Sequence, residues 1–216
     1  MKDENLRIRD KCRAGLIKYL EKAFSAVPET ENPEILDIGC GTGVPTLWLA
    51  GKYSGSITAI DTDSAALCWL KKKAGNINLS DRLTIENTSF FDFKGGLKKY
   101  DIILAEGFLN IVGFEKGFQE VIRLLKKHGY FIIHDEFRDH EKKSAFIRDN
   151  ECRLAGSLYL DENVWWNDYY KELEAEINNR DNYGIIDQFE GDIEEIGCYK
   201  ADPSQFRSIY YVIEKL

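Results

Sequence analysis

The chain contains, at residues 35–43, the stretch Ile35-Leu36-Asp37-Ile38-Gly39-Cys40-Gly41-Thr42-Gly43. An apolar run with one acid leads into three glycines at alternate positions, and an apolar pattern with helical spacing follows from Val44 to Tyr53. This order predicts a buried parallel strand, a tight turn and the start of a helix. Glycines in such a turn permit a positive φ and let a ligand approach the backbone, and the helix directs its unpaired N–H groups at that ligand. The stretch therefore predicts a site for an adenosine-type cofactor.

The spacing of the glycines separates two kinds of cofactor. A dinucleotide-binding turn has Gly at its first, third and sixth positions. Here Val44 holds the sixth position, Gly43 comes one place early, and Asp37 has no role in that pattern. The string instead resembles motif I of the class I S-adenosylmethionine-dependent methyltransferases, and the resemblance continues through most of the chain. A strand–helix turn in some other α/β protein remains the alternative for the string alone.

Composition limits the partners of the chain. It has 216 residues with 29 basic and 37 acidic side chains, a formal charge of −8, which argues against nucleic acid. Its five cysteines are widely spaced and form no C-x-x-C pair, as expected of reduced thiols in the cytoplasm. No apolar run approaches membrane-spanning length, and the charged N-terminus lacks the core of a signal peptide. We expect a cytoplasmic protein without a membrane partner, as a monomer or homodimer.

The periodicity predicts one domain over residues 1–216. Strands are expected at 56–61, 83–87, 100–107 and 130–136, separated by helices at 65–74 and up to Lys127, which gives a parallel sheet with helices on both faces. Beyond Phe137 the pattern predicts a helix at 142–154, a short strand at 156–160, a helix at 179–200 and a last strand at 206–214. The resemblance implies a three-layer Rossmann-like α/β sandwich, with a mostly parallel seven-stranded sheet whose last strand runs antiparallel beside the fifth.

Three parts of this domain have different expected roles. Residues 34–136 form the cofactor-binding core, and residues 137–216 lie on the substrate side. Residues 1–33 form a helical extension, with an apolar stripe between about Leu6 and Phe24. The resemblance implies that this extension could cover the cofactor as a lid, and a solvated basic helix face is the alternative.

Acidic and aromatic residues after the strands are candidates for cofactor binding. Asp61 ends the second strand about twenty residues past the glycines, where a carboxylate can accept both ribose hydroxyls. Asp63 and Ser64 supply helix-capping side chains, which leaves Asp61 for the ribose. The resemblance implies that the loop at 88–93 holds adenine, although its phenylalanines could equally be core. The predicted cofactor-binding residues are Asp37, Gly39, Cys40, Gly41, Thr42, Gly43, Asp61, Thr62, Ser89, Phe90, Asp92 and Glu106.

The chemistry of methyl transfer places few demands on catalytic side chains. In-line displacement at a sulfonium depends mainly on positioning and on exclusion of water, and a base is needed only if the acceptor must lose a proton. Glu106 and His134, each at a strand end, are the candidate catalytic residues. Glu106 could instead bind the amino group of the methionine moiety, and His134 could be structural. Together with Asp135 and Glu136 they could ligate a divalent ion, but we predict no metal.

A late aromatic cluster is the candidate substrate site. Its members, Trp165, Trp166, Tyr169 and Tyr170, have helical spacing, so part of the cluster must face the core. The remainder could line an aromatic acceptor pocket or bind a cationic amine. The string Ala105-Glu106-Gly107, with Asn110 and Gly113-Phe114-Glu115, resembles a branch of these enzymes that acts on small molecules.

We therefore expect methyl transfer from S-adenosylmethionine to a small molecule, with S-adenosylhomocysteine as the product. Two other classes remain open: a non-catalytic module that senses the cofactor or binds a partner, and a nicotinamide-dependent oxidoreductase, against which Val44 argues. A protein or RNA acceptor also remains open, and the acidic charge makes RNA the weaker of the two.

Overall fold

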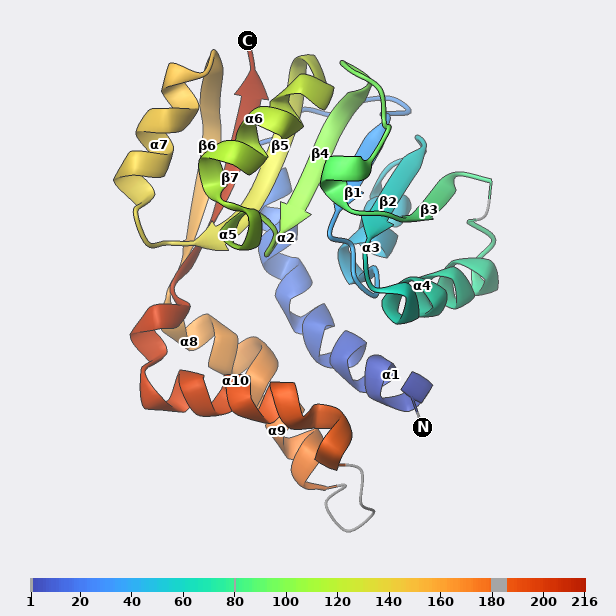
Figure 1. Ribbon diagram of the computed structural model, residues 1–216, viewed down its shortest axis with the longest axis vertical. Coiled ribbons are helices and arrows are strands. Elements are labelled where there is room, and N and C mark those ends of the chain that lie inside the picture. Colours follow the sequence, from blue (N-terminus) through green and yellow to red (C-terminus); the bar gives the residue numbers. More distant parts are fainter. Residues whose placement is uncertain (1, 80, 180–185) are drawn as a thin grey trace.

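The computed structural model describes residues 2–79, 81–179 and 186–216, and its centre is a seven-stranded sheet (Figure 1). The strand order is β3-β2-β1-β4-β5-β7-β6. β7 runs antiparallel to both of its neighbours, β5 and β6, and the other pairings are parallel. This confirms the predicted sheet. The strands are β1 Ile35–Ile38, β2 Ile57–Asp61, β3 Leu83–Asn87, β4 Tyr100–Glu106, β5 Leu125–Glu136, β6 Cys152–Leu160 and β7 Ser208–Lys215.

Helices cover both faces of the sheet because its strands are apolar on both sides. Along β4, Ile102 packs against one helical layer and Ile103 against the other. The first layer contains α2 (Ile17–Phe24), α3 (Val44–Lys52) and α4 (Ser64–Asn76). The second contains α5 (Leu109–Val112), α6 (Phe114–Leu124) and α7 (His140–Asp149). The three-layer sandwich is confirmed, and it directs the carboxyl ends of the parallel strands toward one end of the molecule.

A third group of helices covers that end, and we call it the helical cap (Figure 1). It consists of α1 (Lys2–Arg13), α8 (Glu162–Trp165), a π-turn η3 (Trp166–Tyr170), α9 (Lys171–Asn178), α10 (Glu190–Ala201) and the 3-10 turn η6 (Pro203–Phe206). These segments bury a separate apolar cluster that includes Ile8, Cys12, Leu173, Phe189 and Ile196. Each large apolar side chain buried in this way contributes about 1.5–3 kcal/mol, so the cap holds together largely by its own core.

Several element boundaries differ from the sequence-based expectation. The helix expected to reach Lys127 ends at Leu124, because buried Leu125 already pairs with Tyr100 at the start of β5. The helix expected at 142–154 ends at Asp149, because the chain from Cys152 pairs with β7, and this makes the short strand expected at 156–160 longer. Within the helix expected at 179–200, residues 180–185 lie outside the described residues, a 3-10 turn η5 covers Ile186–Phe189, and α10 follows.

The N-terminal segment with the apolar stripe forms two helices that have different positions. α1 belongs to the cap and α2 to the sheet, with a 3-10 turn η1 (Ala14–Leu16) between them. Two short elements complete the description: the 3-10 turn η2 (Phe90–Asp92) follows β3, and α5 follows β4. Within the described residues no helix is both long enough and apolar enough to cross a membrane.

Candidate active site

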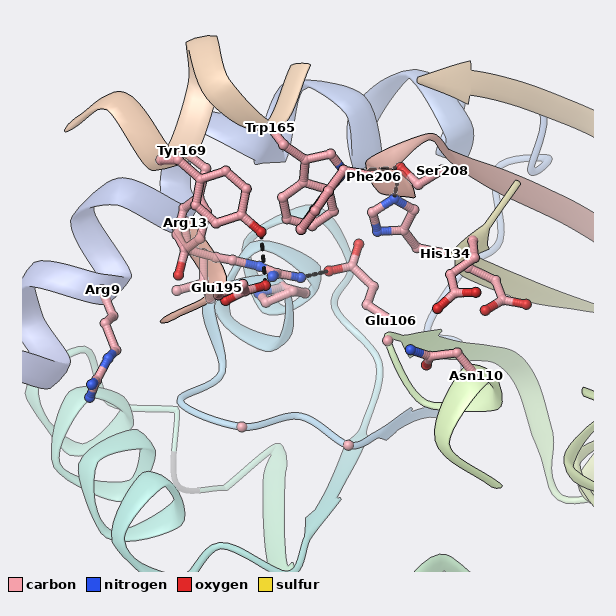
Figure 2. A pocket seen from close by; sticks show the side chains of 18 of the residues that line it. Arg9, Arg13, Glu106, Asn110, His134, Trp165, Tyr169, Glu195, Phe206 and Ser208 are labelled. Carbon is pink, nitrogen blue, oxygen red and sulfur yellow. Dashed lines mark hydrogen bonds and ion pairs between the residues drawn. The ribbon is translucent and has the colours of Figure 1, made fainter. Parts of the chain in front are cut away.

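A cavity of about 660 Å³ lies between the carboxyl ends of β1, β4 and β5 and the helical cap. The turn after β1 lines one side, and the aromatic residues of the cap line the other (Figure 2). Ligands of open α/β sheets bind at this end of the strands.

The glycine turn has the backbone that its sequence predicts. Gly39, Gly41 and Gly43 all have left-handed φ values, of 69°, 52° and 82°. A Cβ on Gly43 would lie 2.3 Å from Cδ1 of Leu70, so this glycine lets α3 and α4 pack closely. A Cβ on Gly41 would meet no heavy atom within 4 Å, and Gly41 lines the cavity. Gly43 is therefore required for packing, and Gly41 leaves room for a ligand.

Four other predicted cofactor-binding residues lie around this turn. Asp37 is 2% exposed and accepts a hydrogen bond of 2.6 Å from Thr46 Oγ1, which ties β1 to α3. Burial raises the pKa of Asp37 to about 7. Cys40 lines the cavity, and burial raises the pKa of its thiol, so it is not a thiolate at neutral pH. Thr42 also lines the cavity. Asp61 fixes the turn by accepting a 2.7 Å hydrogen bond from the backbone N–H of Gly41.

Six of the predicted cofactor-binding residues do not line this cavity, among them Asp61, expected to bind ribose, and the residues expected to hold adenine. They are Gly43, Asp61, Thr62, Ser89, Phe90 and Asp92. Asp61 also accepts a bond from the N–H of Asp63, and Asp63 caps α4 as its sequence position predicts. Phe90 is buried with its ring edge-to-face on Phe108, at a centroid distance of 5.2 Å, which agrees with the core alternative for that residue.

The remaining members of the loop after β3 have local roles. Ser89 caps η2 by accepting a bond from the N–H of Phe91. Thr62 and Asp92 are exposed at the surface. The carbonyl oxygen of Thr62 accepts a bond from the side-chain amide of Asn87.

Glu106 is held in a charged network that local sequence patterns do not reveal. Its side chain is 8% exposed. One carboxylate oxygen lies 3.0 Å from Arg13 Nη2 of α1 (Figure 2). The other accepts a 2.5 Å bond from the hydroxyl of Tyr210 on β7. Burial together with the adjacent Glu106 raises the pKa of Tyr210 well above its ordinary value. Glu106 is therefore a paired carboxylate at the edge of the cavity.

His134 is enclosed in a stack of rings. Its ring lies parallel to that of Tyr210 at 4.2 Å and to that of Trp165 at 5.8 Å. Its Nε2 is 2.9 Å from Ser208 Oγ, which also accepts a 3.3 Å bond from Trp165 Nε1. Burial lowers the pKa of His134 to about 4, so the imidazole is neutral at physiological pH.

The four residues considered as metal ligands already have partners. Glu106 pairs with Arg13 and His134 with Ser208. Asp135 lies 2.7 Å from Lys143, and Glu136 lies 2.8 Å from Arg138. Across the part of the chain that the structure describes, no group of three or more His, Cys, Asp or Glu side chains is arranged to hold a metal ion.

The predicted aromatic cluster is divided between cavity and core. Trp165, Tyr169 and Tyr170 line the cavity. Trp166 does not, and its ring stacks on Tyr199 within the cap at 5.7 Å. The residues that line the cavity without a sequence-based prediction include Arg9, Arg13, Asn110, Glu195, Phe206 and Ser208. Asn110 belongs to the string that resembles the small-molecule branch, and no local motif marks the others, which come from the cap and from β7.

Helix α1 connects the two sides of the cavity. Asp10 accepts hydrogen bonds from Thr42 in the glycine turn and from Trp69 and Lys73 of α4. One turn away from Arg13, Arg9 forms a forked ion pair with Asp192 of α10. The helix is thus fixed both to the glycine turn and α4 and to the rest of the cap.

Comparison with known sequences accounts for this architecture. Residues 29–177 match the family described as "Methyltransferase domain". This chain belongs to that methyltransferase family. The match confirms the resemblance carried by the glycine turn, and S-adenosylmethionine is the methyl donor expected of such a domain.

Individual relatives of this methyltransferase domain have different functions. A ribosomal protein L11 methyltransferase from Ruminiclostridium cellulolyticum is 34% identical over 104 residues, which cover 47% of this chain and 29% of the relative. The crystal structure of the [4+2]-cyclase SpnF has a TM-score of 0.77 at 16% identity and covers 92% of this chain and 80% of its own. A geranyl diphosphate C-methyltransferase from Streptomyces coelicolor, in complex with Mg²⁺, geranyl diphosphate and S-adenosyl-L-homocysteine, has a TM-score of 0.68 at 13% identity, with coverages of 92% and 79%.

These similarities define the fold and the family but not the acceptor. The two structures are too distant in sequence to show more than the fold. The matched stretches span only 20% to 43% of the lengths of the curated relatives.

Proposed function

We propose that this methyltransferase domain transfers the methyl group of S-adenosylmethionine to a small-molecule acceptor. The observation that carries the proposal is the continuous cavity of about 660 Å³ between the glycine turn and the aromatic side of the cap. Cavities of about 300–1,000 Å³ accommodate small ligands.

The residues at the site fit the parts of this cofactor. Gly41 leaves space at the turn where a Cβ would intrude. The methionine moiety carries one ammonium and one carboxylate, and the neighbouring Glu106 and Arg13 have the opposite charges. We assign Glu106 to the ammonium and Arg13 to the carboxylate, so that the cofactor replaces part of the existing ion pair. Asp61 is assigned to the ribose, since each of its carboxylate oxygens can accept a second hydrogen bond besides the one it has.

The protein contributes mainly position and exclusion of water. When bound, the cofactor supplies an electrophilic methyl group on a sulfonium. The cap, including α1, covers the acceptor, and alignment of two reactants can contribute about 7–11 kcal/mol to lowering a barrier. We assign His134 to orienting the acceptor rather than to removing its proton, because a group whose pKa is about 4 is a weak base at neutral pH.

Calorimetry with purified protein tests the cofactor assignment. S-adenosylmethionine and S-adenosylhomocysteine are expected to bind, and NAD is not. Gly41→Ala is expected to abolish binding, because its methyl group enters the cavity. Gly51→Ala, on the exposed side of α3 with no heavy atom near the new Cβ, is the matched control and should bind normally. Binding of NAD in place of the sulfonium compound would support the oxidoreductase alternative.

Incubation with methyl-labelled S-adenosylmethionine and a fractionated cell extract tests the transfer itself. Label is expected in the low-molecular-weight fraction. Label in the protein fraction would instead indicate an acceptor like that of the L11 methyltransferase relative. Binding without any transfer of label would support the non-catalytic sensor, for which fold alone leaves room.

A further inference from the structure

We propose that the acceptor is an amine that enters as a cation and is held between the carboxylate of Glu195 and the aromatic wall of the cavity. The aromatic wall is the set of rings that line the cavity from the cap: Trp165, Tyr169, Tyr170 and Phe206. The inference deepens the proposed methyl transfer and rests on it for the chemical step. The binding of the cation, however, can be measured separately.

The rings of the aromatic wall pack on one another and form a continuous aromatic surface at the side of the cavity. Tyr170 is at the centre, with ring centroids 5.8 Å from Trp165, 5.1 Å from Tyr169 and 5.8 Å from Phe206. A cation is attracted to an aromatic face when it lies within about 6 Å of the centroid, and the attraction increases when the site is desolvated. Within the described residues, no Lys or Arg is found over any of these four rings. Tyr169 and Tyr170 are buried by their neighbours, so the partly exposed rings of Trp165 and Phe206 are the ones that an external cation can reach.

The cations that line the cavity are already neutralised. Each of the three arginines has a carboxylate partner: Arg9 pairs with Asp192, Arg13 with Glu106 and Arg207 with Glu162. An anionic acceptor would have to compete with these partners. The cavity thus offers no obvious site for a second negative charge.

Glu195 differs from three of the other acids that line the cavity, which are paired with cations, and from Asp37, which is buried and bonded to Thr46. Glu106, Asp135 and Glu136 each have a cationic partner. Glu195, on α10, accepts a 2.8 Å hydrogen bond from the hydroxyl of Tyr170, and no cationic side chain among the described residues lies within ion-pair distance of it. Figure 2 shows this bond beside Trp165, Tyr169 and Arg13. Glu195 is exposed to the cavity, and a carboxylate paired only with a neutral phenol, in a cavity that Trp165 and Phe206 also line, is a complementary site for an ammonium group.

The backbone holds this arrangement in place. Tyr169 and Tyr170 end the π-turn η3, and π-turns of this kind occur frequently at functional sites. The carbonyl oxygen of Asp168 lies so near Gly15 that a Cβ on Gly15 would be 2.4 Å away. The Asp168 side chain accepts bonds of 2.6 Å from Tyr19 and from Lys18 of α2. The rings thus come from a segment fixed on two sides.

The proposed step balances with S-adenosylmethionine as the methyl donor. The ammonium first gives one proton to the carboxylate of Glu195, which passes it to water. The neutral nitrogen then uses its lone pair to form a bond to the methyl carbon. The carbon–sulfur bond breaks, and its electron pair remains on sulfur in S-adenosylhomocysteine. The product is a methylated ammonium with the charge that the sulfonium had carried.

Binding of a fixed cation and its neutral isostere tests the inference without turnover. Choline and 3,3-dimethylbutan-1-ol have the same shape and differ in charge. Their dissociation constants are measured by calorimetry with the full chain, both alone and with saturating S-adenosylhomocysteine. Choline is expected to bind about tenfold more tightly than the alcohol, since cation–π and carboxylate contacts each favour the charge. Equal affinities would overturn the proposal, as would tighter binding of 3,3-dimethylbutanoate.

A pair of neighbouring variants locates the effect. Glu195→Gln is expected to weaken choline about tenfold and to leave the alcohol unchanged. Glu194→Gln, on the same helix outside the cavity lining, is the matched control and should change neither. Loss of choline binding in both variants, or in neither, would contradict the role of Glu195. If S-adenosylhomocysteine does not bind but the choline pattern holds, the proposed transfer fails and the cation site stands.

Discussion

The two sides of the cavity are built in different ways. The sheet side is formed by the backbone of residues 39–43 and by acids near the carboxyl ends of β1, β4 and β5, each within a short stretch of sequence. The cap side is formed by side chains from α1, η3, α10 and η6, which lie far apart along the chain. The difference indicates a division of roles. In the proposed function, the local turn binds the cofactor and the assembled wall binds the acceptor.

The largest effect is expected on the sheet side. Gly43→Ala places a Cβ 2.3 Å from Leu70 in a left-handed conformation, which combines overpacking with backbone strain. The free energy of unfolding should fall by about 4 kcal/mol, measured by urea denaturation. Gly41→Ala has the strain without the contact, so it should cost about 1 kcal/mol. Equal destabilisation by the two variants would show that the turn is not divided into a packing glycine and a ligand glycine.

Loss of the ion pair between Arg13 of the cap and Glu106 of the sheet should produce the next largest effect. Arg13→Met leaves the buried carboxylate of Glu106 with Tyr210 as its remaining partner. Removing one member of a buried pair should lower the free energy of unfolding by about 3 kcal/mol. Pairing this variant with Glu106→Gln in a double-mutant cycle separates the lost pair from other effects. If the double variant loses as much unfolding free energy as the two single variants lose together, the coupling between Arg13 and Glu106 is refuted.

Buried His134, which lies between the sheet and the cap, should make the stability of the protein depend on pH. The pKa of His134 is lowered to about 4 in the folded state, so the unfolded chain binds more protons below about pH 6.5. This contribution to stability is complete above the unfolded pKa and is lost as the pH falls toward 4. Between pH 7 and pH 5 the loss should be about 2 kcal/mol. His134→Gln should flatten the profile by that amount, and an unchanged profile would contradict the burial of this histidine.

The outer surface of the cap should show the smallest effect. Lys11 contacts Glu172 and Glu176 at 2.9 Å and 3.0 Å, but its side chain is 60% exposed. Solvent and salt screen such a pair. Lys11→Met should therefore leave the midpoint of thermal unfolding unchanged within experimental error. A clear decrease would show that surface charge, as well as the apolar cluster, holds α1 on the cap.

The sequence predicted the sheet side more accurately than the cap. The glycine turn, the order of strands through β5 and the antiparallel β7 follow from apolar runs and from the family resemblance, and the structure confirms them. The helix boundaries near Leu125 and Cys152 were wrong, because strand pairing with distant partners replaced the local helical tendency. The role of the aromatic cluster stays a prediction, and its spacing alone did not show that Trp166 is the residue turned toward Tyr199.

By itself, the sequence determined the strand–turn–helix at residues 35–53 and hence the family, because glycine conformation and apolar periodicity act within a few residues. Only the tertiary structure decided how the acceptor side is assembled. Arg13 contacts Glu106, from which it is separated by 93 positions in the sequence. Tyr210 contacts the same carboxylate and is 104 positions away from it. Such contacts depend on how helices of the cap pack on the sheet, and no local pattern encodes that packing. The place of Glu195 beside Tyr170 is a consequence of the same assembly.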